Sequence, residues 1–143
     1  DRLRLADAFG ADRTVDVESE DLPAFVRSIT DGYGADTAFE CSGAPAAVRT
    51  GLACLRKRGR FVQAGILHRE VSLDFDDVFF VRELTLAGSH TSNPRSWELA
   101  LRLLAAGSVD LEPLVSESLP LAEWERAFEL IRTRRAVKVV LTP

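Results

Sequence analysis

Three short turns combine small residues with glycine in a way that suits ligand binding through the backbone. They are Cys41-Ser42-Gly43, Ala64-Gly65-Ile66 and Ala87-Gly88-Ser89. Each follows a run of apolar and β-branched residues that predicts a buried parallel strand, and the strand before Cys41 is expected to be covered on both faces. Ligands bind beyond the carboxyl ends of such strands, where glycine lets the backbone come close. The turns therefore predict one shared ligand site, although each glycine could also simply turn the chain.

Few side chains of this sequence are candidates for catalysis. Cys41 and Cys54 lie too far apart for a Cys-x-x-Cys site, and their apolar surroundings predict buried free thiols. His68 and His90 are expected in loops. Glu40 falls inside a predicted buried strand, where a carboxylate needs a polar partner. No catalytic role follows from its position.

Strands alternate with amphipathic helices along the chain, and this order predicts an α/β fold with a parallel sheet and helices on both faces. Asp21 and Asn93 are predicted N-caps, and the apolar spacing on the helix after Asn93 predicts a buried face of Trp97, Ala100, Leu101 and Leu104. The segment 70–81 is ambiguous between an edge strand at 71–73 and a turn of helix at 74–81. We expect helices near 3–9, 22–29, 44–55, 94–104 and 124–131, and strands near 14–17, 37–41, 60–64, 84–87 and 137–141.

The length and net charge of the chain argue against some classes of function. The chain has 143 residues, about the length of one domain, with a net charge of −4 and a pI near 5.2. A general nucleic-acid binder would need a basic face, so this balance argues against one. No apolar run reaches the roughly 18 residues of a membrane span, and we expect no secretory segment. We expect a cytoplasmic protein without nucleic-acid or membrane partners.

Several weak motifs, taken together in their order and spacing, resemble the C-terminal part of a medium-chain, zinc-type alcohol or polyol dehydrogenase. The region around Gly88 and Trp97 is most similar to the threonine and sorbitol dehydrogenase branch. The motifs are Arg2-Leu3, Ala8-Phe9-Gly10-Ala11-Asp12, Gly34-Ala35-Asp36, Glu40-Cys41-Ser42-Gly43, Gly59-Arg60-Phe61-Val62, Ala64-Gly65, Leu84-Thr85-Leu86-Ala87-Gly88-Ser89, Pro120-Leu121, Ala127-Phe128 and Lys138-Val139-Val140-Leu141.

The resemblance implies an incomplete Rossmann-type doubly wound parallel sheet. Residues 1–143 would be the C-terminal portion of a dinucleotide-binding domain plus the C-terminal segment. The glycine-rich βαβ start and the N-terminal catalytic domain with its zinc ligands would precede Asp1, and the absence of methionine agrees with a piece of a longer protein. The chain alone would hold no metal and no catalytic residue. The full-length enzyme would use NAD or NADP and zinc, and would form a homodimer or homotetramer through residues 71–89.

The resemblance also implies roles for particular residues in binding the cofactor. Arg2 matches a basic position that reaches the adenosine ribose, and Lys138 matches one near the diphosphate. Cys41-Ser42-Gly43 matches the turn beside the ribose and diphosphate. Ala64-Gly65-Ile66 matches the turn that meets the nicotinamide ribose and carboxamide. The main chain of Ser89, His90 and Thr91 would hydrogen-bond the carboxamide. Arg2 and Lys138 could instead be ordinary solvated residues.

Three functions remain open at this point. The first is the cofactor-binding part of an NAD(P)-dependent zinc alcohol or polyol dehydrogenase, which transfers a hydride between an alcohol carbon and the nicotinamide. The second is a zinc-free quinone or enoyl reductase of the same superfamily, which the upstream sequence would distinguish. The third is a non-catalytic α/β domain that binds a small ligand or a partner chain, which a cofactor titration would distinguish.

Overall fold

The computed structural model describes residues 2–143. They form two compact units, one made of Val15–Thr91 and the other of the residues before Val15 together with Ser92–Pro143. The expectation of a parallel α/β fold is confirmed, but the strands divide between two sheets. One sheet has the order β1-β2-β3 and the other pairs β4 with β5.

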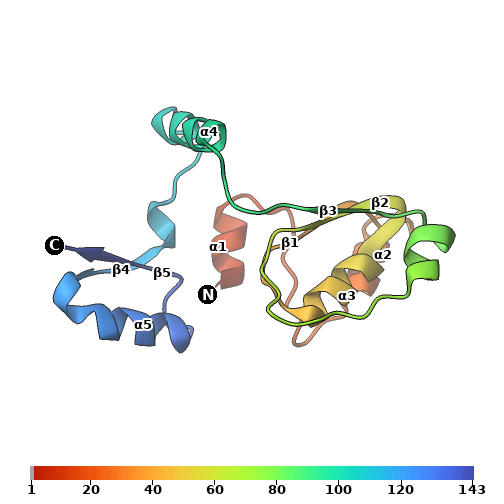
Figure 1. Cartoon of the computed structure of the whole chain (residues 1–143), viewed down its shortest axis with the longest axis horizontal. Coiled ribbons are helices and arrows are strands. Elements are labelled where there is room, and N and C mark those ends of the chain that lie inside the picture. The colour runs from red at the N-terminus through yellow and green to blue at the C-terminus, as the bar shows by residue number, and fades with distance from the viewer. Residues whose placement is uncertain (1) are drawn as a thin grey trace. The chain divides into compact units, whose positions relative to one another are not determined.

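The unit of Val15–Thr91 is built on a three-stranded parallel sheet (Figure 1). Helix α3 packs against β1 and β2, and α2 packs against α3. Helix α2 begins where the sequence predicts, because the Asp21 carboxylate accepts a hydrogen bond from the Ala24 N–H at 3.0 Å. The elements in order are α2 (Leu22–Ser28), β1 (Ala35–Glu40), α3 (Pro45–Cys54), β2 (Leu55–Gln63), the π-helix η1 (Asp76–Val81) and β3 (Thr85–Gly88).

The core of this unit lies between α3 and one face of the sheet. Its buried members are Val48, Leu52, Leu55, Phe61, Val78 and Leu84. On β1, Phe39 is 70% exposed, so no part of the described chain covers its face of the strand. The expectation that this strand is covered on both faces is therefore wrong for the residues described.

Residues 14–17 form no strand, contrary to the sequence-based expectation. The backbone N–H of Glu18 donates to the Asp16 carboxylate at 3.0 Å, and the Asp16 N–H donates to the Glu20 carboxylate at 3.0 Å. Acidic side chains that bond nearby backbone groups in this way favour turns over sheet ladders. The strand-like alternation of residue types at Thr14–Val17 therefore does not produce a strand, and no neighbouring strand among residues 2–143 pairs with this segment.

The ambiguous segment resolves as a helical turn without an edge strand. The π-helix η1 spans Asp76–Val81, and Val71–Leu73 is irregular. The Arg82 guanidinium, just past η1, forms an ion pair with Asp77 at 2.7 Å and donates to the Leu52 carbonyl at 2.7 Å. These bonds attach the segment to the end of α3.

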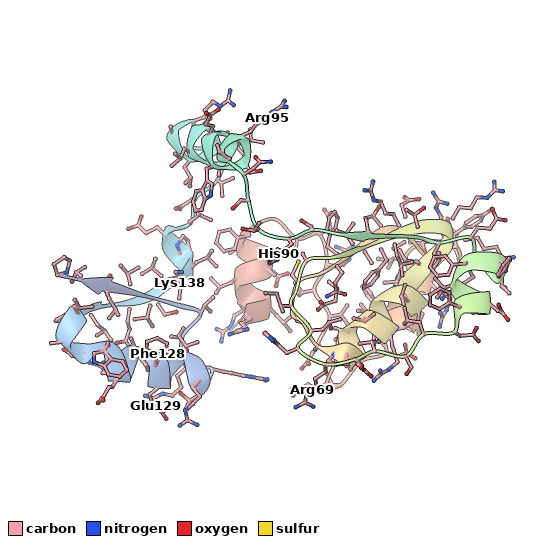
Figure 2. The ribbon with its side chains drawn as sticks, in the orientation of Figure 1. Arg69, His90, Arg95, Phe128, Glu129 and Lys138 are labelled. Carbon is pink, nitrogen blue, oxygen red and sulfur yellow. The ribbon has the colours of Figure 1, made fainter. Side chains whose placement is uncertain are left out.

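The second unit contains a two-stranded parallel sheet with α5 packed on it. Its buried core is Leu119, Ala127, Leu130 and Ala136. Phe128 of α5, labelled in Figure 2, is 67% exposed. The elements are α1 (Arg2–Ala8), α4 (Pro94–Ala105), the short η2 (Glu112–Leu114), β4 (Val115–Pro120), the short η3 (Leu121–Glu123), α5 (Trp124–Arg132) and β5 (Lys138–Thr142).

Helix α4 forms where predicted but exposes its apolar face. Asn93 caps it by accepting from the Ser96 N–H at 2.9 Å. Trp97 and Leu101 are 62% and 61% exposed, and no residue of α4 is buried. The predicted buried face is wrong for the described residues because amphipathic spacing fixes which side chains share a face, whereas burial needs an element to cover that face.

Candidate functional site

The carboxyl ends of β1, β2 and β3 lie level at one edge of their sheet. The register pairs Glu40 with Gln63 and Gln63 with Gly88, which are the last residues of the three strands. Backbone bonds continue this alignment beyond the strands: the Gly65 N–H donates to the Glu40 carbonyl and the Ser89 N–H to the Gln63 carbonyl, both at 2.8 Å. The three glycine-bearing turns thus share one edge, as the sequence predicts. We call this edge, from the three strand ends through Gly43, Ile66 and Thr91, the rim.

A buried carboxylate joins the turns after β1 and β2. Glu40 is 5% exposed. Its Oε1 accepts from the Ser42 N–H at 2.7 Å, the Ser42 hydroxyl at 2.5 Å and the Gly43 N–H at 3.0 Å. Its Oε2 accepts from the Gln63 side-chain amide at 2.5 Å, and that amide also donates to the Gly65 carbonyl at 2.8 Å. These hydrogen bonds of Glu40 therefore hold both turns in place, so its role is structural rather than catalytic.

These hydrogen bonds decide the charge state of Glu40. Burial by itself raises the pKa of the carboxyl, but the bonds from Ser42, Gly43 and Gln63 favour the charged form and outweigh it. The net result is a pKa below the usual value of 4.5. Glu40 is thus an ionised acceptor at neutral pH.

The lowered pKa predicts how stability depends on pH. The carboxylate stabilises the folded state above its unfolded pKa, and this contribution is lost as pH falls through the lower folded pKa. In Glu40→Gln, a carboxamide N–H₂ would face donors, so we expect the unfolding free energy at neutral pH to fall by about 2 kcal/mol. The loss on acidification below about pH 5 should shrink in the variant. Urea denaturation of both full-length proteins across pH measures the two effects, and an unchanged acid slope would contradict the role of Glu40.

Two glycines leave no room for a side chain between the turns. Gly43 has φ +70, and a Cβ there would collide with the Ile66 carbonyl oxygen. A Cβ on Gly65 would collide with the Gly43 nitrogen and lie 2.7 Å from Glu40 Oε2. In contrast, a Cβ on Gly88 would meet no atom within 4 Å. The turns after β1 and β2 are therefore packed backbone to backbone, while the space over Gly88 is open.

The remaining candidate residues divide between the two units. Ser89, His90 and Thr91 follow β3 and are exposed, and Thr91 adopts φ 54. Figure 2 labels His90 just past β3 and Lys138 at the start of β5. Arg2 and Lys138 belong to the other unit. Their roles, like those of the residues at the rim, stay predictions.

Cys41 departs from its expected burial. It is exposed, whereas Cys54 in α3 is buried as predicted. Burial raises the pKa of the Cys54 thiol. The exposure of Cys41 follows from its place one residue beyond β1, at the rim.

Gln63 is the site residue that sequence reasoning missed. Glu40 was expected to need a polar partner, but the partner's identity depends on the register between β1 and β2. One signal in the sequence could have indicated Gln63: it is a polar residue at the end of an apolar strand, directly before Ala64-Gly65.

The family described as zinc-binding dehydrogenase matches residues 1–106 of the chain. The chain belongs to this family. The D-arabitol-phosphate dehydrogenase of Enterococcus avium is 39% identical over 141 residues, which are 98% of this chain and 40% of that protein. The sorbitol dehydrogenase of Halalkalibacterium halodurans is 37% identical over 143 residues, with 99% of this chain and 41% of that protein covered. This zinc-binding dehydrogenase chain thus spans about 40% of the length of these relatives.

Solved structures agree with the family assignment. An alcohol dehydrogenase from Thermotoga maritima superposes with a TM-score of 0.88 at 29% identity, over 99% of this chain and 40% of that one. An alcohol dehydrogenase from Thermus sp. ATN1 superposes with a TM-score of 0.88 at 30% identity, over 99% of this chain and 40% of that one. These matches confirm the α/β fold and the resemblance to the C-terminal part of medium-chain zinc-type alcohol and polyol dehydrogenases.

Residues 2–143 contain neither a cluster of metal-ligating side chains nor a membrane-spanning helix. In this described part of the chain, no three His, Cys, Asp or Glu side chains are grouped so that they could hold a metal ion. Nor does any helix there have the length and apolar character needed to cross a membrane.

Proposed function

We propose that this chain is the cofactor-binding part of an NAD(P)-dependent, zinc-type alcohol or polyol dehydrogenase. In this proposal residues 1–143 supply the second part of the dinucleotide-binding domain and the C-terminal segment of a longer enzyme. The observation that supports it best is the rim, where level strand ends and backbone-packed glycines suit a nucleotide. The polyol dehydrogenases among the relatives favour a small alcohol or polyol as substrate.

The residues at the rim fit a nicotinamide cofactor in their chemistry. The turns after β1 and β2 offer backbone groups at small residues, and Ser89, His90 and Thr91 add main-chain donors and acceptors after β3. When bound, the nicotinamide supplies the hydride chemistry, and these residues bind and orient it. Arg2 and Lys138 would offset phosphate charge.

In this proposal the full-length enzyme uses zinc, and no residue of this chain is assigned to hold it. We also propose that the full-length enzyme is a homodimer or homotetramer. This is supported by β3, which is an edge strand of its sheet, and by Phe80 nearby, which is 80% exposed.

A cofactor titration tests the proposal. The full-length protein should quench or enhance nicotinamide fluorescence on binding NADH or NADPH, and should reduce one of the oxidised cofactors with a polyol. His90→Ala is the matched control at the rim, because its side chain is exposed and the proposed contacts are to the main chain. We expect its cofactor Kd to change by less than about twofold, as for ordinary surface substitutions. Absence of binding at millimolar cofactor would refute the proposal.

A further inference from the structure

A buried negative charge lies directly behind the rim. Glu40 ends β1 and is 5% exposed, and its two carboxylate oxygens face the turns after β1 and β2. A Cβ on Gly65, in the middle of the second of these turns, would lie 2.7 Å from Glu40 Oε2. The carboxylate therefore contacts the inner side of the turns that form the rim.

No cation among residues 2–143 balances this charge. The groups that donate to Glu40 are the N–H and hydroxyl of Ser42, the N–H of Gly43 and the side-chain amide of Gln63, and all of them are neutral. Glu40 forms no ion pair with any described arginine, lysine or histidine. Because the carboxylate is out of contact with water, it is screened less than a surface carboxylate. The rim thus has a fixed, uncompensated negative charge behind it.

The two redox forms of a nicotinamide cofactor differ in the charge of the ring. The oxidised ring carries a positive charge, and addition of a hydride at C4, which brings two electrons and one proton, makes it neutral. The phosphates and riboses are the same in both forms. A fixed negative charge behind the ring therefore attracts the oxidised form more than the reduced form, while its repulsion of the phosphates is the same for both.

We propose that Glu40 shifts the binding preference of the rim toward the oxidised form of the nicotinamide cofactor. This inference rests on the proposed function, in which residues 64–66 and 89–91 hold the nicotinamide end. Glu40 is not a catalytic residue in it, because its carboxylate acts through its charge and not by contact with the cofactor. Preference for the oxidised form makes the bound cofactor harder to reduce, so the charge favours reduction of a carbonyl over oxidation of an alcohol on the enzyme.

Calorimetric titration of the full-length protein with both redox forms of one cofactor tests this role. The pair is NAD⁺ and NADH, or NADP⁺ and NADPH if the wild type binds that pair more tightly. Glu40→Gln removes the charge, so the Kd of the reduced form divided by the Kd of the oxidised form should fall about fivefold or more. Glu40→Asp keeps the charge on a shorter side chain. It should weaken both forms alike and leave this ratio within about twofold of the wild type.

Two further variants keep the test decisive if Glu40→Gln disturbs the turns. Gln63→Lys places an ammonium group where the amide now donates to Glu40 Oε2, and it should lower the ratio in the same direction. Glu83→Gln is the matched control, because it also removes one negative charge from the unit of Val15–Thr91. Glu83 is exposed, precedes β3 at the opposite end of the sheet and pairs with Arg58 at 2.9 Å. Its ratio should stay within about twofold of the wild type.

The possible outcomes separate this inference from the proposed function. Equal ratios in the wild type, Glu40→Gln and Gln63→Lys overturn the inference even if both variants bind the cofactor more weakly, because Glu40 then affects only the shape of the turns. An equal fall of the ratio in Glu83→Gln also overturns it, since the effect would not come from the rim. If the wild type binds neither redox form, the proposed function is refuted and this inference with it.

Discussion

Replacing Gly65 with alanine is expected to abolish nicotinamide binding and to lower the unfolding free energy of the full-length protein by about 3 kcal/mol. The added methyl would collide with the Gly43 nitrogen and lie 2.7 Å from Glu40 Oε2. Neither neighbour can move cheaply, because the first is backbone and the second is a buried carboxylate held by Ser42, Gly43 and Gln63. The two turns must therefore separate, and the rim loses its shape.

Gly88→Ala is the matched control for this prediction. Gly88 ends the neighbouring strand, and a Cβ there meets no atom within 4 Å in the described chain. Its unfolding free energy should change by no more than about 0.5 kcal/mol. Urea denaturation and cofactor titration of both variants give the comparison. Equal stability of Gly65→Ala and Gly88→Ala would show that the turns after β1 and β2 are not packed as described.

Local signals predicted where the elements begin and end. Asp21 and Asn93 both cap helices in the structure, and each does so by a side-chain bond to the N–H three residues on. The apolar runs before Cys41, Ala64 and Gly88 are the three strands of one parallel sheet. A parallel sheet puts the carboxyl ends of its strands at one edge, so the rim could be predicted from these runs alone.

Features that depend on distant partners could not be predicted in this way. Trp97 and Leu101 have the spacing of a buried face, yet nothing in the described chain covers them. Thr14–Val17 has strand-like residues but no neighbouring strand to pair with. The partner of Glu40 depends on the register between β1 and β2, which the sequence does not show. The exposed α4 and the exposed Phe39 agree with a chain that spans about 40% of its relatives' length.

The register that brings Gln63 to Glu40 leads to the second large expected effect. The Gln63 amide now donates to Glu40 Oε2 at 2.5 Å. Gln63→Glu would replace this donor with a second carboxylate beside Glu40, which is only 5% exposed. Like charges this close cannot both ionise at low cost, so the pair should take up a proton at a raised pKa. At pH above about 7 we expect the unfolding free energy to fall by about 3 kcal/mol.

The pH dependence of this variant should have the opposite sign to that of the wild type. The folded state of Gln63→Glu binds a proton more tightly than the unfolded state, so its stability should rise as pH falls from about 7.5 to about 5. The wild type should gain nothing over this range, because the pKa of Glu40 is lowered. In the swapped variant E40Q/Q63E a single carboxylate again faces an amide, so part of the loss at neutral pH should be recovered, although the hydrogen bond from residue 63 to the Gly65 carbonyl is not restored. Urea denaturation at the two pH values measures all three proteins. A fall in the stability of Gln63→Glu on acidification would mean that the side chains at positions 40 and 63 are not in contact. Other residues would then have to connect the turns after β1 and β2.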